Sequence, residues 1–266
     1  MWNNQRNRQR AQYLLLFGLL RPIRSVLGSL IGGFTGTRNK ISKCGSPSLR
    51  RAVWLAATRA PKIIYRGGII MTDFNIILFD DFETLDAFGP AEIIGIMPET
   101  YKLDYFSLHG GTVTSSQNIR VATHPFSDMN PEGILLIPGG LGTRALVNNA
   151  EFIHELNTIA HQAVFVLTVC TGSALLAKTG VLDGRPATSN KMAFEWVQSV
   201  NTKVNWVKQA RWVVDGNCYT SSGVSAGMDM TLGFVGDLHG QDIAKRIAND
   251  IEYIWNSNKD FDPFTP

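Results

Sequence analysis

The sequence predicts an α/β fold for residues 71–266, in which a mostly parallel sheet lies between two layers of helices. Segments typical of strands alternate along the chain with segments typical of helices, which is the pattern of parallel sheets with crossover helices. The most apolar strand-like run, Ala163–Val169, lacks polar alternation, as expected of a central strand covered on both faces. We therefore expect one domain, a flavodoxin-like three-layer sandwich with helices on both faces.

The expected elements follow from hydrophobic period and turn residues. Gly89-Pro90 should interrupt the first helix early, because proline removes a backbone donor. Gly110-Gly111 should form a turn, with short extended pieces after it through Val121. Strands are expected at Asn75–Phe79, Lys102–His109, Gly133–Ile137, Ala163–Val169, Val204–Lys208, Arg211–Val214 and Cys218–Ser221. Helices are expected at Glu83–Met97, Glu151–Gln162, Thr171–Thr179, Lys191–Val200, Ala226–Leu238 and Gln241–Trp255.

Charge is distributed unevenly along the chain. Residues 1–72 contain ten Arg and three Lys but no acidic residue, and Asp73 is the first acid. The other 12 basic residues face all 22 acidic residues, which gives the rest of the chain a net charge of −10. The overall charge of +3 is therefore no argument for nucleic-acid binding, and we expect no nucleic-acid partner.

Residues 1–70 form a basic segment for which three interpretations stay open. Its apolar runs, Tyr13–Leu20 and Val26–Phe34, are too short to span a bilayer, so we expect no membrane partner. The composition is typical of a mitochondrial presequence, or of a basic tail on an acidic surface. We favour the third interpretation, that the segment is not native, since Met71 directly precedes the first strand pattern. We expect it to be disordered and without chemistry, and the protein to be cytoplasmic, or mitochondrial if the presequence is genuine.

The sequence contains three cysteines, of which only Cys170 has a reactive context. Cys44, Cys170 and Cys218 are too scattered for a disulfide framework or a zinc site, so we expect no metal and no cofactor. Cys170 lies where a buried strand runs directly into a helix, which forces a strained corner at the carboxyl end of the sheet. The helix N-terminus should lower the pKa of its thiol. The sequence therefore predicts a nucleophilic cysteine.

Two further groups are candidates for the same site. Asp86 follows the first strand in an apolar stretch, where desolvation would keep its carboxyl protonated for acid catalysis; helix capping is the alternative. Glu92 is a weaker candidate on another helix face. The N–H groups of Gly139 and Gly140, with that of Thr171, form a potential oxyanion pocket, with a plain turn as the alternative. None of the five histidines is placed in the site.

Taken together, these motifs resemble the ThiJ/PfpI superfamily, which has the class I glutamine amidotransferase-like fold. The resemblance extends over residues 73–264 and is closest to the isonitrile hydratase-like branch and to the related domains of AraC-type regulators. The motifs are Leu85-Asp86-Ala87-Phe88-Gly89-Pro90, Ile137-Pro138-Gly139-Gly140, Val169-Cys170-Thr171-Gly172-Ser173 and Gly223-Val224-Ser225-Ala226-Gly227-Met228-Asp229.

The resemblance implies both a set of site residues and a reaction. Asp86, Cys170 and Thr171 match the branch's acid, nucleophile and following threonine, whereas the protease-like and glyoxalase-like branches usually carry histidine after the cysteine. Asn190 stands where the branch's enzyme tends to have a histidine. The implied reaction is addition of water to an isocyanide through a covalent thioimidate on Cys170, which requires no cofactor. Superfamily members commonly dimerise, so we expect a homodimer that acts on a small-molecule substrate.

Other functions are compatible with the same cysteine. They are a glyoxalase or deglycase activity on small dicarbonyls, a non-enzymatic redox sensor in which Asp86 holds oxidised Cys170, and a ligand-binding domain related to AraC-type regulators. No helix-turn-helix pattern follows the domain in this sequence, so we expect no DNA-binding half.

Overall fold

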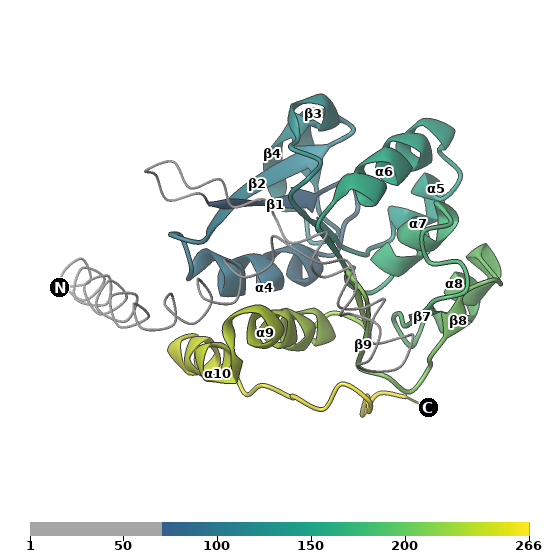
Figure 1. Cartoon of the computed structure of the whole chain (residues 1–266). Coiled ribbons are helices and arrows are strands. Elements are labelled where there is room, and N and C mark those ends of the chain that lie inside the picture. The colour runs from purple at the N-terminus through teal and green to yellow at the C-terminus, as the bar shows by residue number, and fades with distance from the viewer. Residues whose placement is uncertain (1–70, 266) are drawn as a thin grey trace, which may run out of the picture. The chain divides into compact units, whose positions relative to one another are not determined.

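An eight-stranded sheet forms the centre of the computed structural model, which describes residues 71–265 (Figure 1). The predictions for residues 1–70 lie outside this range. The strand order is β3-β4-β2-β1-β5-β6-β10-β9. The strands are β1 (Thr72–Ile77), β2 (Tyr101–Ser107), β3 (His109–Thr114), β4 (Arg120–Pro125), β5 (Ile134–Ile137), β6 (Phe165–Thr168), β9 (Trp212–Asp215) and β10 (Cys218–Ser221).

The pairing in this sheet is mostly parallel, as predicted. β4, β2, β1, β5, β6 and β10 pair in parallel, and only the two edges, β3 with β4 and β9 with β10, are antiparallel. The expected strand at Val204–Lys208 contributes only β8 (Asn205–Trp206), which pairs with β7 (Pro186–Ala187) in a separate small sheet. The carboxyl ends of the parallel strands therefore meet at one edge of the main sheet.

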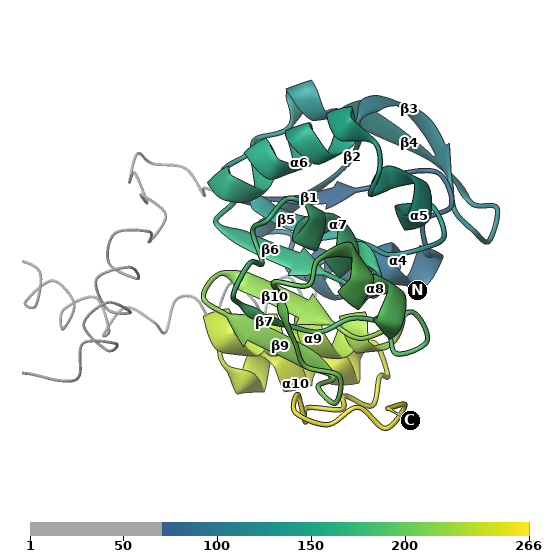
Figure 2. The same cartoon turned by 90° about the vertical axis from the view of Figure 1, so that its right-hand side faces the viewer.

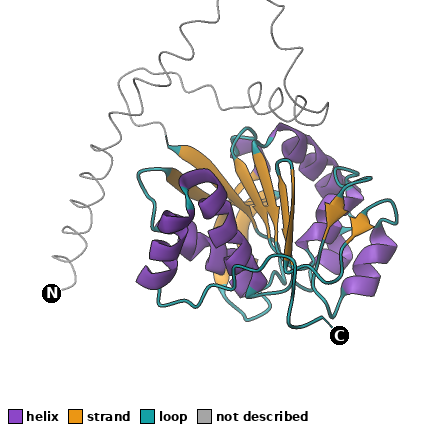
Figure 3. Cartoon of the chain, turned by 60° about the horizontal axis from the view of Figure 1, so that its bottom comes forward, coloured by secondary structure: helices purple, strands orange, loops and turns teal. Residues whose placement is uncertain are grey.

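Helices cover both faces of the sheet, which confirms the flavodoxin-like three-layer α/β architecture (Figure 3). α4, α9 and α10 lie on one face, and α5 to α8 on the other (Figures 1 and 2). The helices are α4 (Thr84–Gly95), the 3-10 turn η2 (Phe126–Asp128), α5 (Thr143–Leu146), α6 (Ala150–Gln162), α7 (Gly172–Lys178), α8 (Phe194–Val200), α9 (Ala226–His239) and α10 (Gln241–Asp250).

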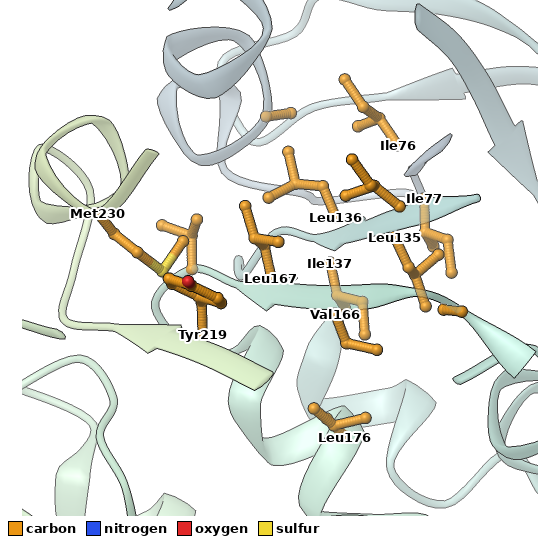
Figure 4. Packing of buried hydrophobic residues seen from close by; sticks show 14 of the residues in the cluster. Ile76, Ile77, Leu135, Leu136, Ile137, Val166, Leu167, Leu176, Tyr219 and Met230 are labelled. Atoms are coloured by element: carbon orange, nitrogen blue, oxygen red, sulfur yellow. The ribbon is translucent and has the colours of Figure 1, made fainter. Parts of the chain in front are cut away.

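The core lies on the central strands, where side chains from β1, β5 and β6 interdigitate with those of the covering helices (Figure 4). All four residues of β5 are buried, as expected of a strand covered on both faces. Ile76, Leu136 and Leu167 are fully buried, each contributing about 1.5–3 kcal/mol by removal from water. This packing makes a rigid base for the loops at the carboxyl ends of β5 and β6.

The expected interruption of the first helix was wrong. α4 continues through Pro90, which is buried with Ala91, Ile93 and Ile94. A proline here removes a single backbone donor, and burial of this helix face outweighs that loss. Gly89 permits close packing, because a Cβ at this position would lie 2.7 Å from Cγ of Met228 on α9.

Two further expectations are corrected at element ends. Gly110 and Gly111 lie inside β3 rather than in a turn, with φ angles of +71° and +88° that glycine tolerates without strain. The last helix ends at Asp250 instead of Trp255. Glu252 has a φ of +52°, and the segment after it leaves the helix to donate hydrogen bonds to Asp229.

Candidate active site

Cys170 occupies the predicted strand-to-helix corner between β6 and α7. Its φ is +56°, a left-handed conformation that is uncommon for any residue other than glycine. Its N–H donates to the Ser222 carbonyl (3.0 Å), and its own carbonyl accepts from the hydroxyls of Ser173 (3.0 Å) and Ser189 (2.8 Å). These bonds hold the strained corner, and the residue is only 6% exposed.

Two glycines allow the backbone to close around this corner. A Cβ at Gly172 would lie 2.2 Å from the Ile137 carbonyl oxygen, at the end of β5. A Cβ at Gly139 would lie 2.6 Å from the Thr171 nitrogen and 2.8 Å from Cβ of Cys170. The loop after β5 therefore packs directly on the cysteine turn.

Asp86 lies at the start of α4, completely buried beside Cys170. Its Oδ2 accepts the Gly139 N–H at 2.9 Å. Burial is the main cause that raises the pKa of Asp86 to about 7; the charge of Glu83 adds to it, while the Gly139 N–H, the Cys170 thiol and the Val224 N–H act in the lowering direction. The other carboxyl oxygen of Asp86, Oδ1, has no hydrogen-bond partner among the described residues. This oxygen is therefore free to accept a proton.

The pKa of Cys170 is raised, which corrects the expectation of a thiol acidified by the helix. Burial is the largest cause, and the negative charge of Asp86 is the second. The N–H groups of Thr171 and Val224 and the side chain of Asn190 act in the opposite direction, but burial outweighs them. The resting cysteine is therefore a neutral thiol, and a base must remove its proton. Asp86, with the lower pKa of the two, is in place to do so.

The Thr171 hydroxyl contacts the segment that follows β5. Its Oγ1 lies 3.1 Å from the Gly140 nitrogen, which donates to it, and 3.1 Å from Oγ1 of Thr143. The Gly139 and Gly140 N–H groups thus already have protein acceptors, Asp86 and Thr171. Their role in an oxyanion pocket stays a prediction, because each N–H would have to leave its present acceptor to bind a substrate oxygen or nitrogen. The Thr171 N–H, in contrast, interacts with the sulfur of Cys170.

Asn190 lies near Cys170, and its role in the site stays a prediction. Its Oδ1 accepts the Ala193 N–H at 3.1 Å, which directs its amide nitrogen the other way. That nitrogen packs on Gly223, where a Cβ would lie only 2.2 Å from it, and the side chain acts on Cys170 in the direction that lowers the thiol pKa. Asn190 is therefore a donor toward the sulfur.

Sequence reasoning missed Val224, whose N–H acts on the pKa of both reactive groups. Its N–H interacts with Cys170 and with Asp86. Its φ of +45° is a genuine outlier for a β-branched residue, and such strain is typical of functional sites. Its only sequence signal was the motif beginning at Gly223, to which no role was given.

Arg144 and Trp196 form a second feature near the cysteine that the sequence did not reveal. The Arg144 guanidinium lies 3.4 Å from the centre of the Trp196 ring. Burial lowers the pKa of Arg144, and a negative charge on Cys170 opposes that shift. Arg144 directly follows Thr143, whose hydroxyl contacts Thr171. The pair therefore brings a positive charge close to the cysteine turn.

Among the described residues, neither a histidine nor Glu92 takes part in the hydrogen bonds and charge interactions given above for Cys170 and Asp86. His239 hydrogen-bonds to Tyr101 at 2.6 Å, His109 lies 3.9 Å from Glu151, and Glu92 is exposed. Within residues 71–265, no cluster of histidine, cysteine or acidic side chains is arranged to hold a metal ion. None of the helices in this range is long and apolar enough to cross a membrane.

These features define a class of protein: a flavodoxin-like sheet with a cysteine at a strained strand-to-helix corner and a buried carboxyl beside it. The family model for the DJ-1/PfpI family matches residues 74–236, and the chain belongs to this family.

Two named relatives show the range of proteins that this chain is similar to. It is 31% identical over 181 residues to isonitrile hydratase of Pseudomonas putida, covering 67% of this chain and 77% of that enzyme. It is 30% identical over 156 residues to the transcriptional regulator GbdR of Pseudomonas aeruginosa, covering 58% of this chain but 42% of the regulator. The family therefore includes both enzymes and regulators.

Solved structures support the same fold. A ThiJ/PfpI family protein from Pseudomonas syringae superposes with a TM-score of 0.61 at 25% identity, covering 77% of this chain and 85% of that one. DJ-1beta of Drosophila melanogaster, at 21% identity, has a TM-score of 0.60 and covers 70% of this chain and 100% of that one.

Proposed function

We propose that this protein is a cysteine-dependent hydratase that converts a small isocyanide and water to an N-substituted formamide. The buried pair of Asp86 and Cys170 is the observation that carries the proposal, because it supplies a base and a nucleophile with no histidine. The likeness to isonitrile hydratase supports the choice of substrate.

In the first step, Asp86 accepts the thiol proton through Oδ1 as Sγ of Cys170 bonds to the terminal carbon of the isocyanide. The proton then passes from the carboxyl to that carbon, which leaves a neutral thioimidate, S–CH=N–R. The Thr171 and Val224 N–H groups and the Asn190 amide stabilise the transient negative charge on sulfur.

In the second step, water adds to the thioimidate carbon with Asp86 as the base. Asp86 passes the proton that it takes from water to the thioimidate nitrogen, which gives the adduct S–CH(OH)–NH–R. Asp86 then takes the hydroxyl proton as the carbon–sulfur bond breaks and passes it to the departing sulfur, and the N-substituted formamide leaves. One water is consumed, and both side chains return to their starting protonation states. The raised pKa of Asp86, about 7, suits a group that must accept and donate a proton at neutral pH.

The restricted exposure of Cys170 is compatible with this substrate class. Only 6% of the residue is exposed, so bulky groups have little access to the sulfur. An isocyano group is linear and presents its reactive carbon at its tip, so it can reach a sulfur that a branched carbonyl compound reaches poorly.

The decisive test is formamide production from cyclohexyl isocyanide, followed by mass spectrometry. We expect turnover by the wild type and a loss of about 10³-fold or more in Cys170→Ala, because the variant lacks the nucleophile. Cys218→Ala is the matched control, since Cys218 is also a buried free cysteine but lies on β10 beside Arg185. Absence of turnover by the wild type would refute the hydratase assignment. Lactate from methylglyoxal, measured in parallel, would indicate the glyoxalase-like alternative.

A ligand-binding domain is the second candidate, favoured by the likeness to GbdR. It predicts affinity for a small molecule without turnover, and equal affinity in Cys170→Ala. The redox-sensor alternative is disfavoured by the burial of Cys170 and its raised pKa, because ready oxidation follows thiolate character and exposure.

A further inference from the structure

A buried ionic cluster lies where the C-terminal segment, residues 251–265, passes β9 (Figure 2). We call it the Arg211 cluster. It contains two cationic and two anionic side chains, all at most 5% exposed, and the proposed chemistry uses none of them. Its members are Lys191, Arg211, Asp229 and Asp262.

The Arg211 side chain joins three separate parts of the fold. Its Nε donates to Oδ2 of Asp229 on α9 at 2.6 Å, and its Nη1 donates to Oδ1 of Asp262 in the C-terminal segment at 3.3 Å. Its Nη2 donates to Oγ of Ser225 at 3.2 Å. Ser225 directly follows Val224, the strained residue whose N–H faces the sulfur.

The Arg211 backbone holds the other end of the same loop. Its carbonyl accepts the Ser222 N–H at 2.8 Å, and the Ser222 carbonyl accepts the Cys170 N–H at 3.0 Å. Arg211 is thus bonded on both sides of Val224. A β-branched residue with a φ of +45° needs such support, because its conformation costs on the order of 1–3 kcal/mol.

Lys191 links Asn190, the second residue that acts on the Cys170 sulfur, to the same cluster. Its Nζ donates to the Ala210 carbonyl at 2.7 Å and to Oγ1 of Thr188 at 3.0 Å, and it lies 3.8 Å from Oδ2 of Asp262. Lys191 is the neighbour of Asn190. Asp262 therefore contacts Lys191, the neighbour of Asn190, directly, and it reaches Ser225, the neighbour of Val224, through Arg211.

We infer that Arg211 and Asp262 are positioning residues through which the C-terminal segment holds the Val224 N–H and the Asn190 amide on the sulfur of Cys170. This inference rests on Cys170 as the reacting group of the proposed function. It assigns the cluster a role in thiol reactivity beyond stability. A cluster with a structural role alone would change the unfolding temperature and leave the folded thiol unaltered.

The test measures alkylation of Cys170 by iodoacetamide at pH 8, by mass spectrometry of the peptide, and needs no substrate. We expect Asp262→Asn to slow alkylation about five- to tenfold, because the thiolate loses aligned donors, with tenfold equal to one pKa unit. Ser225→Ala removes only one Arg211 contact, so it decides the question if Asp262→Asn does not fold. Asp260→Asn is the matched control, the same change in the same segment at an exposed ion pair.

Slower alkylation in folded Asp262→Asn or Ser225→Ala, with Asp260→Asn at the wild-type rate, would support the inference. Unchanged or faster alkylation in the folded variants would overturn it, as would equal slowing in Asp260→Asn. Circular dichroism and thermal melting establish folding in each case. Because the readout is the thiol itself, a failure of isocyanide turnover leaves this result interpretable.

Discussion

At the scale of single residues, the site contains strained backbone conformations and a buried carboxyl group, both of which destabilise the folded state. Cys170 and Val224 both adopt positive φ angles. The Asp86 carboxyl is completely buried, and its Oδ1 has no hydrogen-bond partner among the described residues. Strain of this kind persists where the surroundings determine it, and it clusters at active sites. The same burial that destabilises a charged Asp86 gives it a pKa suited to proton transfer at neutral pH.

The raised pKa of Asp86 predicts a pH-dependent loss of stability. The folded pKa of about 7 exceeds the ordinary value of 3.8, so the group's contribution is most favourable below 3.8 and is lost as pH rises through 7. Between pH 5 and 8, the wild type should lose about 2–3 kcal/mol of unfolding free energy relative to Asp86→Asn, which cannot ionise. Urea unfolding of both proteins at each pH measures this difference. A difference that stays constant with pH would contradict the raised pKa.

At the scale of elements, the site depends on how closely β5, α4 and α7 approach one another. Gly139 brings the loop after β5 onto the cysteine turn, and its N–H holds Asp86. Gly172 allows α7 to begin directly against the end of β5. These contacts are between backbones, so no side-chain rearrangement can relieve an added methyl group.

We predict that Gly172→Ala destabilises the fold by about 1–3 kcal/mol, because its Cβ would lie 2.2 Å from the Ile137 carbonyl. Gly95→Ala is the matched control at the end of α4, where an added Cβ has no neighbour within 4 Å. It should be neutral or stabilise by up to about 1 kcal/mol through helix propensity. Thermal melts of the two variants compare the effects, and equal melting temperatures would show that the close approach is unimportant.

At the scale of the whole molecule, several large apolar side chains are exposed on the surface. The large apolar side chains of Leu141 and Met192 are 70% and 99% exposed, and each lies within two residues of a candidate site residue. Isolated exposed apolar residues are common on folded proteins and need no partner to explain them.

The expected homodimer is a prediction about this scale. Light scattering coupled to size-exclusion chromatography should give a mass of twice the 29.3 kDa of the chain. Dilution should convert the dimer to monomer only at low concentration, since a specific dimer buries a substantial interface. A mass of 29.3 kDa at every concentration would show that the protein is a monomer.

The sequence by itself determined the mostly parallel α/β sandwich and the position of Cys170, because both depend on local period and on a strand that meets a helix directly. It also singled out Asp86, Thr171 and Asn190, through residue types in an apolar context and through family motifs. The carboxyl's expected desolvation agrees with its raised pKa.

Only the tertiary structure decided the electrostatics and the long-range supports of the site. The thiol pKa is set by the balance of burial against N–H donors from three different segments, which no local pattern reports. The continuous α4 is explained by burial of the helix face that carries Pro90, and the chain after α10 turns away to donate hydrogen bonds to Asp229. Val224 and Arg211 act through contacts between residues far apart in the chain, so their roles emerge only once the chain is folded.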